Sequence, residues 1–354
     1  TEAEDASAHY FRVELFNVNP ENTSLLNAEE IRDYLSFVAP VPYQNTFYYR
    51  DKVYAHAKEL GVIIDEYHIT LNAQPLFKKY VTDIKEASGK KNDDIFDVQF
   101  YDLLDDHGII LGWMWIGLSQ FKKAIPAKMN PMRGIRLRKE NIQIGTEDTL
   151  QKLFKEERGN NYFVGEIFAV SQELIPNSQR DYFNENPTRV EFEKQLRDVF
   201  NELHILYRLG SEANSVIKAL ENANKKAIYF TEMEKKGHFS GKEEKASALE
   251  EVEKAQKEAK AKVQKVKNKT VADDSAAAKV LARITKSQKD TIKIKSLPTQ
   301  PDTKTDPLAW LRQKLPQKDR SLLKLLNKIF SIIRQNTDKD TYDIIVEKII
   351  NELK

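Results

Sequence analysis

The sequence predicts an α+β fold, in which a mixed sheet with helices is followed by an extended α-helical region. Runs of aromatic and β-branched residues, which are typical of strands, fill residues 108–120, 133–145 and 161–170. Beyond Pro187, apolar side chains recur at mostly three- and four-residue spacing, the period of an amphipathic helix. Because strands dominate one part of the chain and helices another, the pattern favours α+β over an alternating α/β fold.

The first 95 residues add further expected elements. Residues 9–19 alternate large and polar side chains, which predicts a strand. Residues 28–60 have helical patterning, interrupted at residues 39–44, where two prolines impose an extended turn. Two short runs, residues 67–72 and 76–81, predict a hairpin.

The helical half contains a stretch rich in lysine and glutamate, residues 242–269. Within it, two sets of positions repeat every seven residues: Leu249, Gln256 and Val263, and Val252, Ala259 and Val266. This spacing indicates a coiled-coil seam, while the many Glu–Lys pairs equally suit a solvated single helix, and both interpretations stay open. Residues 321–353 carry the apolar stripes of two short helices, which we expect to dock on another chain or on the preceding helices.

Composition narrows the class of protein. The 354 residues include 56 Lys and Arg against 54 Asp and Glu, so the net charge of +2 gives no global reason to expect nucleic acid or an acidic membrane as partner. The sequence has no cysteine, which excludes disulfides and thiolate chemistry. No apolar run approaches the roughly 20 residues that span a bilayer. The acidic residues 1–8 lack a signal core, so we expect a cytoplasmic protein without a membrane partner.

Motifs for self-sufficient chemistry are missing from the sequence. It has no glycine-rich phosphate loop, no dinucleotide-binding GxGxxG, no HExxH and no GxSxG. Its six histidines are scattered without metal-ligand spacing, so we predict no metal site. Acidic pairs such as Asp93–Asp94 and Asp105–Asp106 lie in turn-like contexts, where nothing is expected to shift their pKa values for acid–base work.

Three features in order carry a resemblance to a known family. The first is GWMWIGL followed by the proline-bearing KKAIPAKMNPM, the second is RGIRLRKENIQIG, and the third is YFVGEIFAVSQELIPNSQRDYF. Together, residues 109–183 resemble the middle, or transducer, domain of the GHKL superfamily, which groups gyrase, ninety-kilodalton heat-shock chaperones, histidine kinases and MutL. The similarity is closest to the heat-shock chaperone branch with its bacterial form HtpG, and one departure is Ile175, which separates Leu174 from Pro176.

The resemblance assigns roles to two residues of the third feature. In the chaperones an Asn-x-x-Arg loop reaches into the nucleotide site, where its arginine contacts the terminal phosphate. By position, this implies that Arg180 is a catalytic arginine finger and that Asn177 holds the loop or contacts phosphate, with Asp181 orienting Arg180. The residues alone also suit a helix start, with Asn177 or Ser178 as its cap.

A lysine is a second candidate for contact with phosphate. Gyrase and MutL place a transducer lysine on the phosphate, and the loop between the first two features contains Lys122, Lys123 and Lys128. The resemblance makes Lys128 a candidate nucleotide-binding residue. The alternative is a basic loop in contact with solvent.

The resemblance also divides the chain. It implies the end of an ATPase domain and a link at residues 1–95, a transducer-like domain at 96–186, long helices at 187–295, a linker at 296–320 and a helical hairpin at 321–354. The superfamily's Glu/Asn helix, DxGxG turn and glycine-rich lid do not occur in the sequence. We therefore expect ATP and Mg²⁺ to be bound by an N-terminal domain outside this chain, which alone should be inactive, whereas the full-length protein should be an ATPase.

Three functions follow as expectations. The leading one is the middle and C-terminal portion of a homodimeric chaperone-like ATPase, which couples ATP hydrolysis in its own N-terminal domain to closure of a clamp on a protein client. The second is a nucleic-acid clamp of the MutL or MORC kind, in which DNA is gripped by the Lys-rich helix and by a basic strip formed by Arg133, Arg136 and Arg138. The third is a non-enzymatic coiled-coil scaffold.

Overall fold

The computed structural model describes residues 12–19, 21, 23–267, 275–287 and 320–352. The chain forms two compact units, one comprising Thr1–Lys225 with Glu250–Ile294 and the other Lys226–Leu249 with Lys295–Lys354. The described residues combine a mixed sheet with helices, which confirms the α+β class.

The first unit is built on a five-stranded sheet with the order β5-β6-β9-β7-β8. Its strands are β5 (Asp97–Leu104), β6 (Ile110–Leu118), β7 (Gly134–Lys139), β8 (Ile142–Ile144) and β9 (Val164–Ala169). Neighbouring strands are antiparallel except β7 and β9, which are parallel. The predicted strand segments at 108–120, 133–145 and 161–170 are confirmed as β6, the β7–β8 hairpin and β9.

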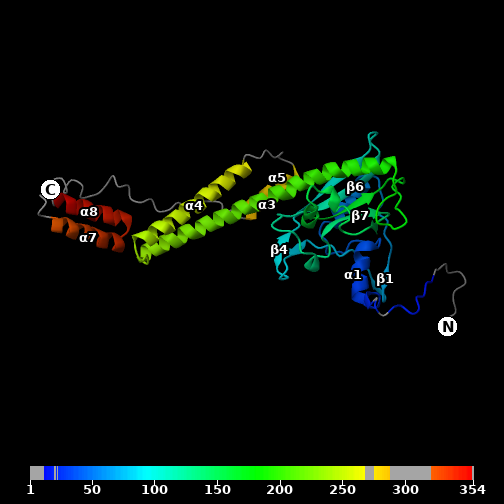
Figure 1. Ribbon diagram of the computed structural model, residues 1–354, viewed down its shortest axis with the longest axis horizontal. Coiled ribbons are helices and arrows are strands. Elements are labelled where there is room, and N and C mark those ends of the chain that lie inside the picture. The colour runs from blue at the N-terminus through cyan, green and yellow to red at the C-terminus, as the bar shows by residue number, and fades with distance from the viewer. Residues whose placement is uncertain (1–11, 20, 22, 268–274, 288–319, 353–354) are drawn as a thin grey trace. The chain divides into compact units, whose positions relative to one another are not determined.

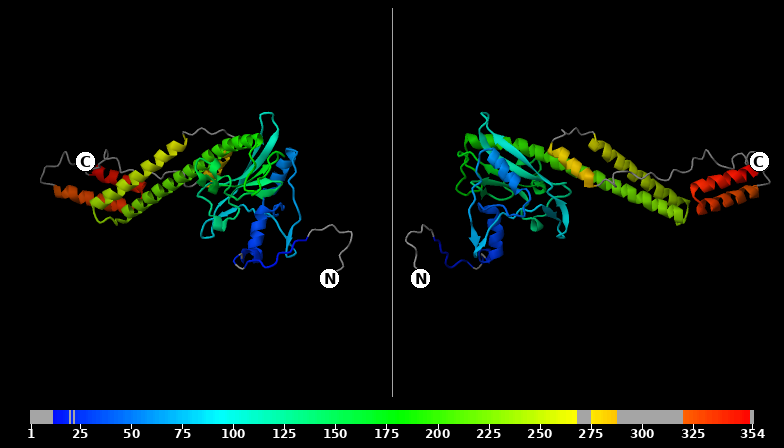
Figure 2. Two further views of the ribbon diagram at one scale, coloured as in Figure 1. Left: turned by 45° about the vertical axis from the view of Figure 1, so that its right-hand side comes forward. Right: turned by 180° about the vertical axis from the view of Figure 1, so that it is seen from behind.

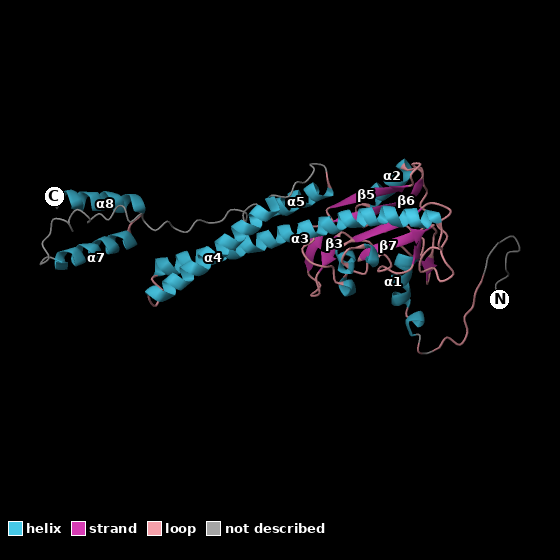
Figure 3. Cartoon of the chain, turned by 45° about the horizontal axis from the view of Figure 1, so that its top comes forward, coloured by secondary structure: helices cyan, strands magenta, loops and turns pink. Residues whose placement is uncertain are grey.

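One face of the sheet packs against α3 (Pro187–Lys236). Successive side chains of a strand point to opposite faces, and on this face the strands contribute apolar residues such as Met114, Leu137 and Ile167. The amphipathic stripe of α3, including Phe192 and Phe200, covers them. α3 runs along this side of the strands (Figure 1; Figure 3).

The opposite face is covered by side chains from the region that precedes β5. The elements of this region are η1 (Thr23–Leu26), α1 (Ala28–Val38), α2 (Arg50–Glu59), the hairpin β1 (Thr70–Leu71) and β2 (Gln74–Pro75), and the hairpin β3 (Asp83–Lys85) and β4 (Lys91–Asp94). Phe37, Tyr43 and Tyr80 from this region pack on Trp115 and Phe168 of the sheet. Seen from behind, the blue helices lie on the side of the sheet away from α3 (Figure 2).

Short 3₁₀ helices fill the connections between the strands. η2 (Ala127–Met129) lies between β6 and β7, and η3 (Gln151–Leu153) and η4 (Glu157–Tyr162) lie between β8 and β9. The β7–β8 connection is a two-residue turn, in which Glu140 and Asn141 have φ of 51° and 59°. Positive φ at both positions is the geometry of a type I′ hairpin turn.

The lysine- and glutamate-rich stretch forms α4 (Lys242–Lys267). Ala255 and Ala259 of α4 pack with Leu220 and Ala223 of α3, with Val263 beside them. This contact favours the seam interpretation over a single solvated helix. α5 (Ala276–Ser287) then places Val280 and Ile284 in the core of the first unit.

The second unit contains the helices expected near the C-terminus, α7 (Arg320–Asn336) and α8 (Lys339–Glu352). Leu326, Phe330 and Val346 form a small core between them. The expected linker at 296–320 lies, apart from Arg320, outside the described residues. Among the helices that the structure describes, none combines the length and apolarity needed to cross a bilayer.

The strand expected at residues 9–19 is not formed in its described part, residues 12–19. Val13, Leu15 and Phe16 are instead exposed to solvent. A strand requires a neighbouring strand to satisfy its main chain, and no described strand pairs with this segment.

Candidate functional site

The predicted residues Asn177 and Arg180 lie together in one tight turn between β9 and α3. The amide of Arg180 donates to the carbonyl of Asn177 at 3.0 Å. The side chain of Asn177 donates to Asp181 Oδ1 at 2.6 Å and accepts from the Asp181 amide at 3.3 Å. Both functional atoms of the Asn177 amide are therefore used to hold the turn.

The turn is closed on both sides by backbone contacts. Pro176 bridges to Phe183, and the Asn177 amide donates to the Tyr182 carbonyl at 2.9 Å. Leu174 and Phe183 are buried in the core beneath it. Asp181 therefore lies in a hairpin-like loop and not at a helix start.

The helix start that the residues alone suggested at Asn177 or Ser178 is wrong. α3 begins at Pro187, where Asn186 Oδ1 accepts from the Arg189 amide at 2.7 Å as the helix cap. An asparagine followed by proline at the first helical position is itself a sequence signal for a helix start.

The turn is docked against the loop that follows β8. The amide of Gly145 donates to the carbonyl of Arg180 at 2.8 Å. Gly145 has φ of +65°, and a Cβ added there would lie 2.7 Å from the Asp181 carbonyl oxygen and would also collide with Thr149 Oγ1. This close approach requires glycine.

Arg180 itself adopts a left-handed backbone, with φ of 53°, and its side chain is exposed. Its guanidinium has no hydrogen bond or ion pair with any residue that the structure describes. A non-glycine residue in this conformation costs roughly 1–2 kcal/mol, so the turn presents a free cation on a strained, firmly anchored backbone.

Lys128 lies elsewhere, in η2 between β6 and β7. Its side chain is exposed and makes no ion pair within the described part of the chain. Of the three predicted site residues, the structure thus brings Asn177 and Arg180 together and leaves Lys128 on a separate loop.

The prediction that Arg136 and Arg138 belong to a basic strip on the protein surface is wrong. Arg136 and Arg138 do share one face of β7, but both are buried. Arg136 donates to the carbonyls of Pro131, Met132 and Arg133 at 2.7–3.2 Å. The strip is covered because the elements preceding β5 fold onto this face of the sheet.

Arg138 can be buried because it lies beside the carboxylate of Glu166 on the neighbouring strand β9. Glu166 and Arg138 are both 0% exposed, and Arg138 Nε donates to Glu166 Oε1. Glu166 also accepts from Lys78 Nζ at 3.2 Å, from Tyr80 at 3.1 Å and from Tyr43. We call these five residues the Glu166 cluster.

The charges of the Glu166 cluster depend on one another. Burial alone would raise the pKa of Glu166, but Arg138 and Lys78 outweigh this effect and lower it to about 2. Burial, followed by the charge of Arg138, lowers the pKa of Lys78 to about 7 against the opposing effect of Glu166. Because the cluster is closed to solvent, it links residues 43–80 to the sheet and offers no access to a substrate.

Sequence reasoning missed Glu166, Lys78, Tyr43 and Tyr80. The available signal was a single carboxylate inside the apolar strand VGEIFA, because an isolated buried charge is stable only when it is paired. That signal predicts a buried partner, but the partners lie 28, 86, 88 and 123 positions away in the sequence.

Among the described residues, no three histidine or carboxylate side chains gather closely enough to hold a metal ion. No protein-family model matches the chain, and no curated protein matches its sequence significantly.

Proposed function

We propose that this chain is the middle and C-terminal portion of a GHKL-type, chaperone-like ATPase. In this proposal ATP and Mg²⁺ are held by a nucleotide-binding domain outside this chain. Arg180 enters that site from the turn at residues 177–181. The protein acts as a homodimeric clamp that closes when the arginine meets the terminal phosphate.

The observation that supports the proposal is that the guanidinium of Arg180 is exposed and has no partner among the described residues. A guanidinium without a partner, on a turn anchored through Gly145 and Asn177, is ready to donate forked hydrogen bonds to phosphate oxygens. Left-handed backbone strain at a polar residue is often retained where the residue acts. An arginine delivered from another domain makes hydrolysis depend on domain closure.

The turn is also coupled to the long helix. Arg189 near the start of α3 donates to the Phe183 carbonyl at 3.0 Å and lies over the Tyr182 ring at 4.9 Å. Asn186 Nδ2 donates to the Glu173 carbonyl at 2.7 Å. Displacement of the turn by a bound phosphate therefore acts directly on the first turn of α3, a route from nucleotide to helix.

The nucleic-acid clamp is the weaker alternative, because Arg136 and Arg138 are inside the protein. Lys128 stays a candidate for phosphate contact because its side chain is free and exposed. The homodimer is supported by exposed apolar side chains on α7 and α8, among them Leu325, Ile332 and Ile344. Deleting residues from 321 onward should convert a dimer to a monomer in light scattering, and a surviving dimer would move the interface elsewhere.

ATP turnover by the complete gene product tests the proposal. Arg180→Ala should lower kcat by about 100-fold or more, since arginine fingers supply roughly 10³–10⁵ in rate, with little change in nucleotide affinity. Arg180→Lys should not restore the rate, because a lysine cannot form the forked contact. Arg158→Ala, an exposed arginine paired with Glu156, is the control and should leave turnover unchanged.

Unchanged turnover in Arg180→Ala would reject the finger role. Absence of the Glu/Asn helix and DxGxG turn from the complete gene product would reject the ATPase proposal altogether.

A further inference from the structure

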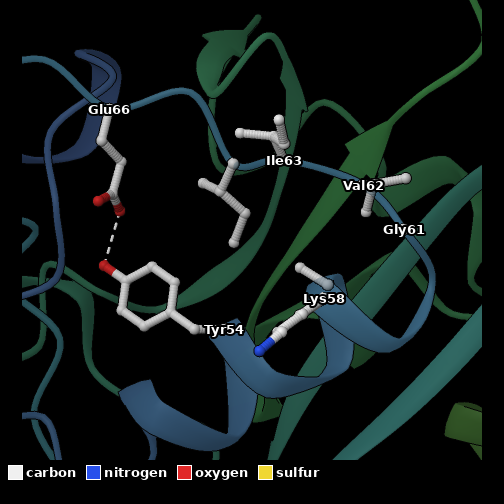
Figure 4. Close-up of a pocket in the computed structure, with 8 residues that line it drawn as sticks. Tyr54, Lys58, Gly61, Val62, Ile63 and Glu66 are labelled. Atoms are coloured by element: carbon white, nitrogen blue, oxygen red, sulfur yellow. Dashed lines mark hydrogen bonds between the residues drawn. The ribbon is translucent and has the colours of Figure 1, made fainter.

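Tyr207 on α3 has a buried hydroxyl without a hydrogen-bond partner in the described part of the chain, and the residue is only 3% exposed. Buried tyrosine hydroxyls normally find a partner. Tyr54 shows the usual arrangement at a pocket of about 460 Å³ beside α2, where its hydroxyl donates to Glu66 at 2.6 Å (Figure 4). The hydroxyl of Tyr207 therefore lacks an acceptor that this part of the chain does not supply.

His204, one helical turn before Tyr207, has a similar unsatisfied group. Its Nδ1 is also buried and has no partner that the structure describes. The rings of His204 and Tyr207 meet edge to face with their centroids 5.3 Å apart, and the ring of Tyr162 in η4 stacks on Tyr207 at 4.7 Å. Residues three apart share one face of a helix, so both unsatisfied atoms lie on the face of α3 that η4 contacts.

An ion pair that is open to solvent joins α3 to the residue before η4. Arg208, which follows Tyr207, donates from Nη1 to Glu156 Oε1 at 3.0 Å. Arg158 donates from Nε to the other carboxylate oxygen, Oε2, at 2.6 Å. The side chains of Arg208 and Glu156 are 47% and 35% exposed. Exposed ion pairs contribute little free energy, so a stronger anion can replace the carboxylate on Arg208.

Positive charge prevails around the two unsatisfied atoms. Burial lowers the pKa of His204, Glu156 opposes this effect, and three cations lower the pKa further, so these charges lie near the ring. The cations are Lys155, Arg158 and Arg208, and the carboxylates on the same stretch are those of Glu156 and Glu157. A hydroxyl is a donor, and Nδ1 is a donor in one tautomer of the ring. The missing group is therefore an acceptor, and the cations favour a negatively charged one.

We propose that His204, Tyr207 and Arg208 bind a phosphate group, which takes the place of Glu156 on Arg208. A carboxylate has two oxygens in one plane, and both oxygens of Glu156 are already taken by arginines. A phosphate group has at least three oxygens that point in different directions, so it accepts from the guanidinium, the hydroxyl and the imidazole together. Glu156 keeps its contact with Arg158 in the bound state.

This site is separate from the turn that carries Arg180. α3 begins beside that turn at Pro187, and Tyr207 lies about 30 Å further along the helix. The phosphate bound here is therefore not the one that Arg180 is proposed to contact, and the site does not depend on the nucleotide function.

Isothermal titration calorimetry of the whole chain with inorganic phosphate tests the site, with sodium chloride at the same ionic strength as reference. We expect saturable binding with a Kd on the order of 1 mM. Tyr207→Phe should weaken binding about tenfold, because it removes one hydrogen bond to a charged group. The variant should unfold at the same or a higher temperature without phosphate, because the deleted hydroxyl had no partner.

Tyr229→Phe is the matched control, because Tyr229 is a 61% exposed tyrosine further along α3 and should leave phosphate affinity unchanged. Absence of saturable binding would overturn the proposal. Equal affinities of Tyr207→Phe and the parent protein would also overturn it, and would assign the hydroxyl to a buried water molecule.

A second pair of variants tests the exchange of Glu156 for phosphate. Glu156→Gln should tighten phosphate binding about fivefold, because a neutral amide competes less well for Arg208. Glu157→Gln is the control, because it removes one negative charge from the adjacent, exposed residue and leaves the ion pair with Arg208 intact. Equal effects of the two variants would overturn the exchange, since they would show that only the overall charge matters.

A titration with phenyl phosphate separates two sources of the same group. Tighter binding of phenyl phosphate than of inorganic phosphate would assign the site to a phosphate monoester. Tighter binding of inorganic phosphate would assign it to the free ion. Either result supports the site, and failure of both probes to bind would overturn it.

Discussion

Arg138 on β7 donates from Nε to the carboxylate of Glu166 on the neighbouring parallel strand β9, and neither side chain has any exposed surface. Lys78 and Tyr43 reach the same carboxylate from the elements that cover this face of the sheet. The carboxylate therefore joins two parts of the chain that are far apart in sequence.

Glu166→Gln should lower the free energy of unfolding by about 3–5 kcal/mol, because Arg138 and Lys78 would remain buried without their counter-charge. Urea denaturation measures the effect. Adding Lys78→Met should recover part of the loss, since one uncompensated charge is then removed. The control is Glu185→Gln, because Glu185 is 94% exposed and pairs with Arg189 only at 4.0 Å, which should change stability by less than about 0.5 kcal/mol. Similar losses for the two glutamates would contradict the role given to the Glu166 cluster.

The lowered pKa of Glu166, about 2, predicts a specific pH dependence. The native carboxylate stays ionised where the unfolded one, with a pKa of about 4.3, takes up a proton. Its contribution to stability is therefore complete above about pH 4.3 and is lost as the pH falls toward 2, with a slope of up to about 1.4 kcal/mol per pH unit. In ¹³C-labelled protein, the Glu166 Cδ resonance should not titrate above about pH 3. A midpoint near pH 4.3 in the titration of this resonance would show that the ion pair between Glu166 and Arg138 is weaker than its geometry indicates.

Gly145→Ala tests the anchoring of the Arg180 turn. An added methyl group meets the Asp181 carbonyl and Thr149, so the variant suffers both the positive φ and a collision. Gly108→Ala is the matched control, because Gly108 also has a positive φ of +77° but no atom within 4 Å of the added Cβ. Thermal unfolding should show that Gly145→Ala is less stable than Gly108→Ala by about 1–3 kcal/mol. Equal losses would mean that the turn is not pressed against the β8 loop.

Arg180→Gly tests the backbone strain at Arg180. Glycine adopts a φ of 53° without steric cost, whereas alanine does not. Arg180→Gly should therefore be more stable than Arg180→Ala by roughly 1 kcal/mol in chemical denaturation. Both variants remove the exposed guanidinium equally, so any difference between them reports the backbone alone. Equal stability of the Arg180→Ala and Arg180→Gly variants would show that the backbone at residue 180 is not strained.

The local elements could largely be predicted from the sequence. The aromatic and β-branched runs at 108–120 and 161–170 became β6 and β9, and the apolar spacing beyond Pro187 became α3. These predictions succeed because side-chain period and propensity act over a few residues. The strand expected at residues 9–19 was predicted wrongly, because a strand also needs a neighbouring strand, which the pattern of its own residues does not supply.

The candidate site could be predicted only in part. The resemblance to a known family indicated Asn177 and Arg180 as a pair, and the turn that holds them is local. The main chain at Arg180 is held by Gly145, whose amide donates a hydrogen bond to it across 35 positions of sequence. The alternation of Arg136 and Arg138 along one strand correctly indicated that they share one face of the sheet. It did not indicate that this face would be covered by other parts of the chain.

The sequence by itself determined where most strands of the main sheet and the long helix form, and its resemblance to a known family singled out Asn177 and Arg180. Only the tertiary structure decided that the cations of β7 are internal and that Arg180 is external. The physical reason is that the energy of a charged side chain depends on its distance from partners and from water. Those distances are set when the elements carrying Tyr43 and Lys78 fold onto the sheet above Glu166.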